Sequence, residues 1–404
     1  MSKGSDSSLP SRAPTRLVCF VNGIYANEIG GGDVYFAHLA RGVLATGRPL
    51  HFFGGHVLKE YLERQGLPLN LTLTDRHKGN LGDVTSLRGQ FRLLFDFVRR
   101  CFGTLRKLGE VRPEDYAYAM SDFWFDAIPL VFCRARVKIL YLGMMAPTLW
   151  EVISRGRPDV PASRLASLYY WLSQQISFRL FRLCRQGQVT YSHPDMKRYL
   201  QRFGYPETNL TYVPNGMDVA AADAAPERKE FDVVWAGRVH PQKGVDDLLA
   251  TLEWLGKRLP DFRAVIIGRS KTVLEPKIRQ LGLSENVVFT GLVSEAEKFR
   301  TLKASRVFVM PSRYESWGIV VGEALASGIP VVAYELECYR PVFGAFARYV
   351  KPFERQLFAE AVEREVREMR AGRNYLSGMD LASLKRELSW SSAQAAFCKL
   401  LGSL

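Results

Sequence analysis

Residues 306–333, RVFVMPSRYESWGIVVGEALASGIPVVA, constrain the fold more than any other stretch of this chain. Arg306 to Met310 is a short apolar run of strand character that a proline ends. Ile319 to Ala326 has helical composition, and Gly328 follows it at the position where a helix often ends with positive φ. Pro330 to Ala333 is a second apolar run. The stretch therefore predicts a strand–loop–helix–strand unit of a parallel sheet.

Two glutamates lie on this unit, Glu315 in the predicted loop and Glu323 on the predicted helix. A loop at the carboxyl end of a parallel strand faces the ligand crevice, and the following helix begins there with unpaired N–H groups and a positive dipole end. We expect Glu315 to bind hydroxyls, while the N–H groups of Ser316, Trp317 and Gly318 hold an anionic group. Glu323, about two turns further on, is placed to reach a ribose.

The pattern P-S-x-x-E-S-W-G followed by E-A-x-A-x-G-x-P-V-V-A resembles the donor-site signature of the retaining glycosyltransferases of family 4. The resemblance implies an α/β chain with the GT-B fold, in which two Rossmann-like domains with parallel sheets face a central cleft and a C-terminal helix crosses back to the first domain. It implies that Glu315 binds hydroxyls of the transferred sugar and that Glu323 binds the ribose of a nucleotide-sugar. Solvated glutamates are the alternative.

A second motif, G-R-x-x-x-x-K-G at residues 237–244, lies between a predicted strand and a predicted helix. The planar guanidinium of Arg238 and the point charge of Lys243 both suit phosphate oxygens. In the family, the matching arginine and lysine bind the donor diphosphate, so these two residues join Glu315 as catalytic candidates. The loop from Gly291 to Val293 resembles the family segment that touches the nucleobase through backbone groups, which makes both residues donor-site candidates.

The first strand is predicted from Arg16 to Asn22, and glycines lie between it and a helix from about residue 34 to 45. Such glycines let a backbone approach a ligand closely, although no G-x-G-x-x-G fingerprint is present. Family members often carry a Gly-Gly here, opposite the donor phosphates, so Gly31 and Gly32 are predicted to line the cleft. A flexible turn is the alternative.

The acceptor side is less well defined by the sequence. Further strands are predicted at residues 116–120 and 137–142, and family members often place a histidine in this neighbourhood. This chain has no histidine between His77 and His193. We expect a methionine after the second strand to occupy that place, with nearby aspartates as polar candidates or, alternatively, as turn and capping residues. The acceptor-side candidates are Asp122, Asp126, Met144 and Met145.

The 404 residues are enough for two domains with cores of their own. A P-N-G-x-D turn at residues 214–218 resembles the family's entry into its second domain, and an Ala-rich segment follows it. The expected divisions are a disordered tail at 1–14, an acceptor domain at 15–218 joined by the crossing helix at 389–404, a linker at 219–228 and a nucleotide-sugar donor domain at 229–388.

The net charge of +14 favours anionic partners. Without a zinc finger, an RNP-type motif or a terminal basic block, we exclude nucleic acid. A predicted helix at 83–108 has six positive charges against Asp96 in its body, and a second one at 163–186 has no acid. The first either lies on an anionic membrane surface or packs on the sheet with a solvated face. Its apolar residues recur at three- and four-residue spacing: Leu87, Phe91, Leu94, Phe95, Val98, Phe102 and Leu105.

The six cysteines are scattered without a C-x-x-C pair, and no apolar run reaches the roughly 18 residues that span a bilayer. We therefore expect a cytoplasmic protein, with peripheral attachment to the inner face of the membrane as a further hypothesis. A metal-binding D-x-D is absent from the sequence, so neither a metal nor another cofactor is expected.

Together with the family resemblance, these observations predict a retaining, metal-independent hexosyltransferase. Its expected donor is a nucleotide-sugar, with UDP- and GDP-sugars favoured. The expected acceptor is lipid-linked or a saccharide, in bacterial-type polysaccharide, lipopolysaccharide or glycolipid synthesis. A soluble small-molecule or protein acceptor is one alternative, and a non-catalytic membrane adaptor of the same fold is another. A sugar phosphorylase and a nicotinamide oxidoreductase are disfavoured, because the sequence has neither a motif for a pyridoxal lysine nor a dinucleotide fingerprint.

Overall fold

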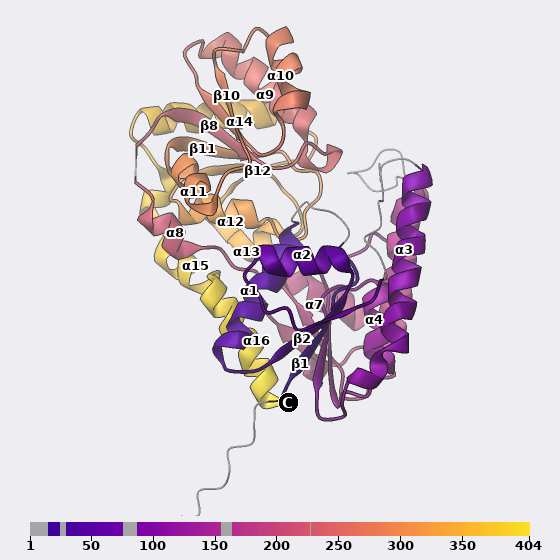
Figure 1. Ribbon diagram of the computed structural model, residues 1–404. Coiled ribbons are helices and arrows are strands. Elements are labelled where there is room, and N and C mark those ends of the chain that lie inside the picture. The colour runs from indigo at the N-terminus through magenta and orange to yellow at the C-terminus, as the bar shows by residue number, and fades with distance from the viewer. Residues whose placement is uncertain (1–14, 25–29, 76–86, 155–163, 227) are drawn as a thin grey trace, which may run out of the picture. The chain divides into compact units, whose positions relative to one another are not determined.

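The structure is a computed structural model that describes residues 15–24, 30–75, 87–154, 164–226 and 228–404. The predicted tail at 1–14 lies outside these residues. The described chain forms two parallel β-sheets with helices packed around each (Figure 1). It divides into two compact units, unit 1 with residues 1–141, 179–188 and 401–404, and unit 2 with residues 142–178 and 189–400. The domain boundaries expected from the sequence stay a prediction.

The first sheet has seven strands in the order β3-β2-β1-β4-β5-β6-β7. Its interior strand β1 is buried throughout, as expected for an apolar run covered on both faces. Leu17 pairs in parallel with Leu50 on one side and with Tyr116 on the other. The strands are β1 (Leu17–Phe20), β2 (Leu50–Gly54), β3 (Leu71–Leu73), β4 (Tyr116–Ala119), β5 (Val137–Tyr141), β6 (Gln188–Tyr191) and β7 (Leu210–Tyr212).

Helices connect these strands, as parallel neighbours require. The helices are α1 (Gly31–Ala45), α2 (His56–Arg64), α3 (Leu87–Arg106), α4 (Trp124–Phe132), α5 (Leu149–Ser154), α6 (Arg164–Phe181) and α7 (Pro194–Arg202). Short 3-10 turns lie at Leu108–Glu110 and Glu207–Asn209.

The second sheet has six strands in the order β10-β9-β8-β11-β12-β13. Alternate residues of a strand point to opposite faces, and here Val234 and Phe308 contribute to one core while Val233 and Val307 contribute to the other. The sheet is therefore buried on both sides, which explains its unbroken apolar strands. The strands are β8 (Phe231–Ala236), β9 (Ala264–Ile267), β10 (Val287–Gly291), β11 (Ser305–Met310), β12 (Val331–Tyr334) and β13 (Arg348–Val350).

Two sets of helices cover these cores. The first core packs against α8 (Val219–Ala224), α11 (Glu295–Lys303), α12 (Ile319–Ala326), α13 (Tyr339–Phe343) and α15 (Leu381–Glu387). The second core packs against α9 (Val245–Arg258), α10 (Lys271–Gln280) and α14 (Arg355–Arg370). Further 3-10 turns lie at Pro241–Lys243, Gly344–Phe346 and Tyr375–Gly378. The segment expected as a linker thus contains a helix, α8.

The last helix, α16 (Trp390–Ser403), corresponds to the crossing helix expected from the sequence. Its final residues, 401–404, belong to unit 1, where Arg48 Nη2 donates a hydrogen bond of 3.4 Å to the carbonyl oxygen of Leu401. Residues 390–400 belong to unit 2.

Helix α3 places part of its predicted apolar face at the surface. The sequence predicts an apolar face through Phe91, Phe95 and Phe102 and leaves open whether it meets a membrane or the sheet, and these three rings are exposed. The helix packs on α4 through a neighbouring face, where the Phe97 ring stacks on Phe125 with centroids 4.2 Å apart. Apolar residues occur all around this helix, so spacing alone does not identify the inward face. No helix in the described parts of the chain is long and apolar enough to cross a membrane.

Candidate active site

The two sequence motifs lie on neighbouring strands of the second sheet. The G-R-x-x-x-x-K-G loop follows β8, and the loop that contains Glu315 follows β11, which pairs in parallel with β8 through Val307 and Val233. Because the carboxyl ends of parallel neighbours lie at one edge of the sheet, the loops meet there. The strand order therefore brings together two motifs that are distant in sequence.

Three polar contacts hold these loops in register. The carbonyl oxygen of Gln242 accepts the N–H of Arg313 at 2.8 Å, and its amide donates to the carbonyl oxygen of Tyr314 at 2.7 Å. Beside them, Lys243 Nζ donates to Glu315 Oε1 at 2.5 Å, with both side chains mostly shielded from solvent. The predicted phosphate-binding cation and the predicted sugar-binding carboxylate are therefore in direct contact.

Two glycines permit this close approach. Gly244 has φ 63°, and a Cβ there would lie 1.8 Å from the carbonyl oxygen of Pro311. Gly318 has φ 89°, and a Cβ there would lie 2.6 Å from the ring of Tyr339. Both combine a left-handed conformation with no room for a side chain, so glycine is required at each position. Each glycine immediately precedes a helix, α9 and α12 respectively.

Helix α12 begins with free hydrogen-bond donors. The first printed bond in this helix is donated by Val321 to the carbonyl oxygen of Gly318. Within the described residues, the backbone N–H groups of Ser316 to Val320 have no hydrogen-bond partner. The side chain of Trp317 is buried against Phe343, so only its backbone can face a ligand. Free N–H groups at a helix start are donors that suit an anion, and the anion-binding role expected for them stays a prediction.

Glu323 is buried on α12 with its two oxygens in different situations. Oε1 accepts a hydrogen bond of 2.7 Å from Lys298 Nζ, which also binds Glu295 at 2.8 Å. Oε2 is buried and has no partner in the described part of the chain. Burial raises the pKa of Glu323, and the Lys298 ammonium opposes that rise. Lys298 was not predicted, because a lysine on an exposed amphipathic helix carries no local signal of this contact.

The other donor-side candidates lie along the same edge of the second sheet. Arg238 is exposed in the loop after β8. Gly291 ends β10 with φ 71°, and its carbonyl oxygen accepts the N–H of Gly268 at 2.9 Å. Val293 packs against the core that also contains α12. The arrangement offers cations, free amides and a buried carboxylate oxygen, the groups that bind a phosphorylated polyhydroxyl ligand.

The candidates on the first sheet have different surroundings. Gly31 and Gly32 are the first residues of α1 and are exposed. Asp126 is buried, and it accepts the N–H of Asn22 at 2.7 Å and the hydroxyl of Ser121 at 2.6 Å. Burial raises the pKa of Asp126 to about 7, although these hydrogen bonds lower it. Asp126 therefore links Asn22, which follows β1, to Ser121, which follows β4, and its carboxylate does not project freely from the sheet.

The remaining acceptor-side candidates are also held in place. Asp122 is buried. The carbonyl oxygen of Met144 accepts hydrogen bonds from the Tyr170 hydroxyl at 2.7 Å and from the Gln174 amide at 2.5 Å. Met145 adjoins it and is half-buried. An acceptor role for these residues stays a prediction.

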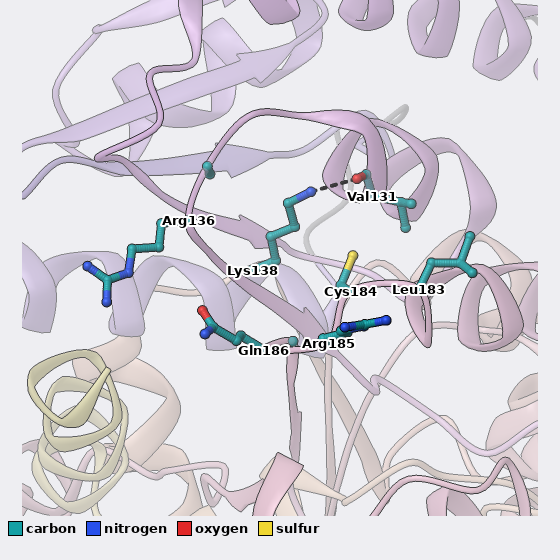
Figure 2. A pocket seen from close by; sticks show the side chains of 9 residues that line it. Val131, Arg136, Lys138, Leu183, Cys184, Arg185 and Gln186 are labelled. Carbon is teal, nitrogen blue, oxygen red and sulfur yellow. Dashed lines mark hydrogen bonds between the residues drawn. The ribbon is translucent and has the colours of Figure 1, made fainter.

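A cavity of about 380 Å³ in unit 1 lies at the opposite edge of the first sheet, beside the residues that precede β5 and β6. Figure 2 shows its basic lining, which includes Arg136, Lys138 and Arg185. Lys138 Nζ donates a hydrogen bond of 2.6 Å to the carbonyl oxygen of Val131, at the end of α4. Since parallel α/β sheets bind their ligands at the carboxyl ends of the strands, we do not assign the active site to this cavity.

The segment that contains both motifs is similar to known glycosyltransferases. Residues 220–371 match the family model for glycosyl transferases group 1. The phosphatidyl-myo-inositol mannosyltransferase of Mycolicibacterium smegmatis is 37% identical over 165 residues, covering 39% of this chain and 41% of that protein. The D-inositol 3-phosphate glycosyltransferase of Segniliparus rotundus is 30% identical over 250 residues, covering 57% and 54%. The matches span about two fifths of the length of the first such relatives.

Solved structures match almost the whole chain at low identity. Anabaena Alr3699/HepE in complex with UDP-glucose has a TM-score of 0.69 and 16% identity, with 96% of this chain and 100% of that chain covered. WaaG, a glycosyltransferase involved in lipopolysaccharide biosynthesis, has a TM-score of 0.61 and 15% identity, with 92% and 98% covered. These matches confirm the GT-B fold.

Proposed function

We propose that this chain, whose residues 220–371 match the family model for glycosyl transferases group 1, transfers a hexose from a nucleotide-sugar to an acceptor hydroxyl. One observation carries the proposal. Glu323 is buried with one oxygen held by Lys298 and the other without a partner among the described residues. An unpaired buried acceptor costs free energy, and a ribose hydroxyl would satisfy it.

The surrounding groups suit a diphosphate leaving group. Negative charge develops on that group as the glycosidic bond breaks, and Arg238, Lys243 and the free amides of residues 316–320 can stabilise it. Each charge-assisted hydrogen bond contributes roughly 1.5–3 kcal/mol. Glu315 binds hydroxyls of the sugar while Lys243 holds it in place. We propose transfer with retention and without a metal, the leaving phosphate accepting the acceptor proton, on the strength of the family resemblance.

The donor is proposed to be a UDP- or GDP-sugar. A relative named as a mannosyltransferase and a structural neighbour bound to UDP-glucose support this class without choosing between the bases. A thermal-shift and calorimetric panel of UDP-glucose, GDP-mannose and ADP-glucose tests the proposal. We expect UDP-glucose or GDP-mannose to bind and to raise the unfolding temperature, with ADP-glucose as the comparison. Failure of both UDP-glucose and GDP-mannose to bind would contradict the proposed donor class.

Matched glutamate variants test the site itself. We expect Glu323→Ala to weaken binding of the selected nucleotide-sugar at least tenfold, because it removes the ribose acceptor. Glu365→Ala is the control, since Glu365 is also buried and paired with a cation, Arg348, but lies on α14. Equal losses in both variants would indicate general destabilisation instead of a donor contact. Lys243→Ala is expected to weaken binding similarly, through the lost phosphate contact.

The acceptor is proposed to lie at an anionic membrane surface, as a lipid-linked saccharide or glycolipid. The exposed face of α3 supports this: Phe91 and Phe95 are 71% and 70% exposed, and Phe102 is also exposed. Arg88 and Arg92 lie exposed on the same helix. Rings that enter the headgroup layer and cations that attract anionic lipids are the two parts of a peripheral membrane contact.

Not every charge on α3 contributes to this surface. Arg100 is buried, and Arg99 pairs with Asp96 at 2.7 Å. The exposed cations Arg88, Arg92, Arg106 and Lys107 remain. Each is worth about 1 kcal/mol near an anionic surface. The proposed attachment is therefore reversible and weakens with salt.

Co-sedimentation with vesicles tests the membrane contact. We expect binding to vesicles of phosphatidylcholine with phosphatidylglycerol at low salt, and weaker binding to phosphatidylcholine alone or at high salt. Phe91→Ser with Phe95→Ser should reduce binding severalfold. Leu357→Ser, at an exposed apolar position of α14, should leave it unchanged. Absence of binding to both vesicle types at low salt would contradict the membrane proposal and favour a soluble acceptor.

A further inference from the structure

His56 and Asp75 form a pair at the carboxyl edge of the first sheet, within unit 1. His56 begins α2 just after β2, and Asp75 follows β3, the neighbouring strand. The carboxylate of Asp75 accepts a short hydrogen bond from His56 Nδ1 and a bond of 3.1 Å from the backbone N–H of the same residue. His56 is therefore held through both its backbone N–H and its imidazole ring.

Asp75 is itself held by a buried cation. Its side chain is fully buried, and Arg100 Nε lies 3.5 Å from Oδ2. Arg100 also donates to the carbonyl oxygens of Asn22 at 3.1 Å and Ile24 at 2.6 Å, just after β1. At Gly55 a Cβ would lie 2.2 Å from the Asp75 carboxylate, so the backbone closes tightly over the pair. This network fixes the direction of the imidazole.

The pair determines which ring nitrogen is available. The carboxylate oxygen accepts from Nδ1, so in the tautomer that donates to Asp75 the second ring nitrogen, Nε2, carries the lone pair. The His56 side chain is 31% exposed, and Nε2 has no hydrogen-bond partner among the described residues. The result is an oriented, accessible acceptor for a hydroxyl group, at the sheet edge where parallel α/β proteins bind ligands.

We propose that His56 binds a hydroxyl of a polyhydroxylated acceptor, a sugar or a cyclitol, with Asp75 as its positioning residue. The inference rests on the proposed glycosyl transfer, whose acceptor it describes.

Chemical footprinting tests the binding directly. Diethyl pyrocarbonate acylates an unprotonated imidazole nitrogen, and mass spectrometry of peptides reports the rate at each histidine. We expect myo-inositol, mannose or glucose to slow the modification of His56 severalfold, with that of the partly exposed His38 on α1 as internal reference. An unchanged His56 rate with all three probes would count against the site, whether or not the protein binds nucleotides.

Kinetics separates a binding role from a structural one. His56→Asn keeps an amide donor for Asp75 but removes the Nε2 acceptor, whereas the longer His56→Gln side chain can supply an oxygen near that position. With the donor selected above and phosphatidylinositol vesicles or free saccharides as acceptors, we expect the acceptor KM of His56→Asn to rise at least tenfold. The donor KM and the unfolding temperature should stay unchanged, and His56→Gln should recover part of the loss.

Glu63→Gln, at an exposed position of α2, is the matched control and should behave as the wild type. Wild-type acceptor kinetics in His56→Asn would overturn the inference while leaving the proposed transfer intact. If the wild type binds no nucleotide-sugar, the proposed function fails instead, and the footprinting result still decides whether His56 binds hydroxyls.

Discussion

At the scale of single residues, this protein shows how a buried environment prepares polar side chains for a ligand. Lys243 and Glu315 neutralise each other, while Glu323 keeps one oxygen without a partner among the described residues. Burying such groups costs free energy, and folding tolerates that cost where partners are well placed. The groups of the candidate site are therefore held in position by the protein itself.

The proposed roles of Lys243 and Glu315 predict that sugar chemistry and nucleotide binding respond differently to substitution. We expect Glu315→Gln to lower kcat at least tenfold while changing the affinity for UDP or GDP less than threefold. In the proposed site the Glu315 carboxylate binds the sugar. Removing its charge leaves the Lys243 ammonium available to bind phosphate. Glu335→Gln, at an exposed position after β12, is the control. A collapse of nucleotide affinity with normal turnover of bound donor would contradict the assignment.

Asp126 makes stability depend on pH. Its pKa in the folded protein is about 7 against 3.8 in the unfolded chain, so the folded state binds more protons between these values. This contribution to the free energy of unfolding is fully present below pH 3.8 and is lost as pH rises through 7, by up to about 4 kcal/mol. We expect Asp126→Asn to flatten this dependence in urea unfolding at pH 4.5 and 7.5.

The control for that experiment is Asp261→Asn. Asp261 is exposed, and hydrogen bonds from Arg370 lower its pKa, which gives the opposite sign of pH dependence. A slope of the same size in the wild type and in Asp126→Asn would show that another group causes it.

At the scale of elements, α3 shows that one helix can carry an apolar face inward and another outward. Phe97 and Cys101 are buried against α4, while Phe91, Phe95 and Phe102 face solvent in unit 1. Exposed large rings at this density mark an interaction surface on a protein. Stability and membrane binding should therefore depend on different residues of the same helix.

Two phenylalanines of α3 test this division. We expect Phe97→Ala to lower the free energy of unfolding by about 3–5 kcal/mol, because it opens a cavity beside Phe125. Phe95→Ala should change it by less than about 0.5 kcal/mol, as for other exposed positions. Urea denaturation measures both. Similar losses in the two variants would mean that the Phe95 ring is buried in solution.

At the scale of the whole molecule, the carboxyl edges of the two parallel sheets carry different sets of polar side chains. The donor-side motifs lie after β8, β10 and β11, whereas the His56–Asp75 pair lies after β2 and β3. Each group of residues is supported within its own unit by hydrogen bonds and packing. The two edges can therefore be probed separately.

Amide hydrogen exchange across the whole chain tests where a nucleotide binds. Bound UDP or GDP should slow exchange at residues 316–320, because their N–H groups gain phosphate as a hydrogen-bond partner. The segment 237–244 should be protected as well. Protection confined to residues outside these two segments would place the nucleotide elsewhere.

The sequence by itself determined much of the second sheet. α12 begins and ends at the predicted residues, and β11 and β12 lie within one residue of their predicted bounds, because glycine, proline and apolar runs act locally on the backbone. Motifs with fixed spacing also selected Lys243, Glu315 and Glu323 as donor-site candidates without knowledge of the fold, and their roles stay predictions. In the first half, β2, β3 and α2 carried no comparable motif, so His56 and Asp75 were not found.

Only the tertiary structure decided which residues meet. Lys243 and Glu315 are 72 positions apart, and they pair because β8 lies beside β11 in the sheet order. Lys298 reaches Glu323, and Asp75 orients His56, through packing between separate elements. The inward face of α3 likewise follows from contact with α4. Local propensity sets where an element forms, but side-chain partners depend on long-range packing, which a linear pattern does not encode.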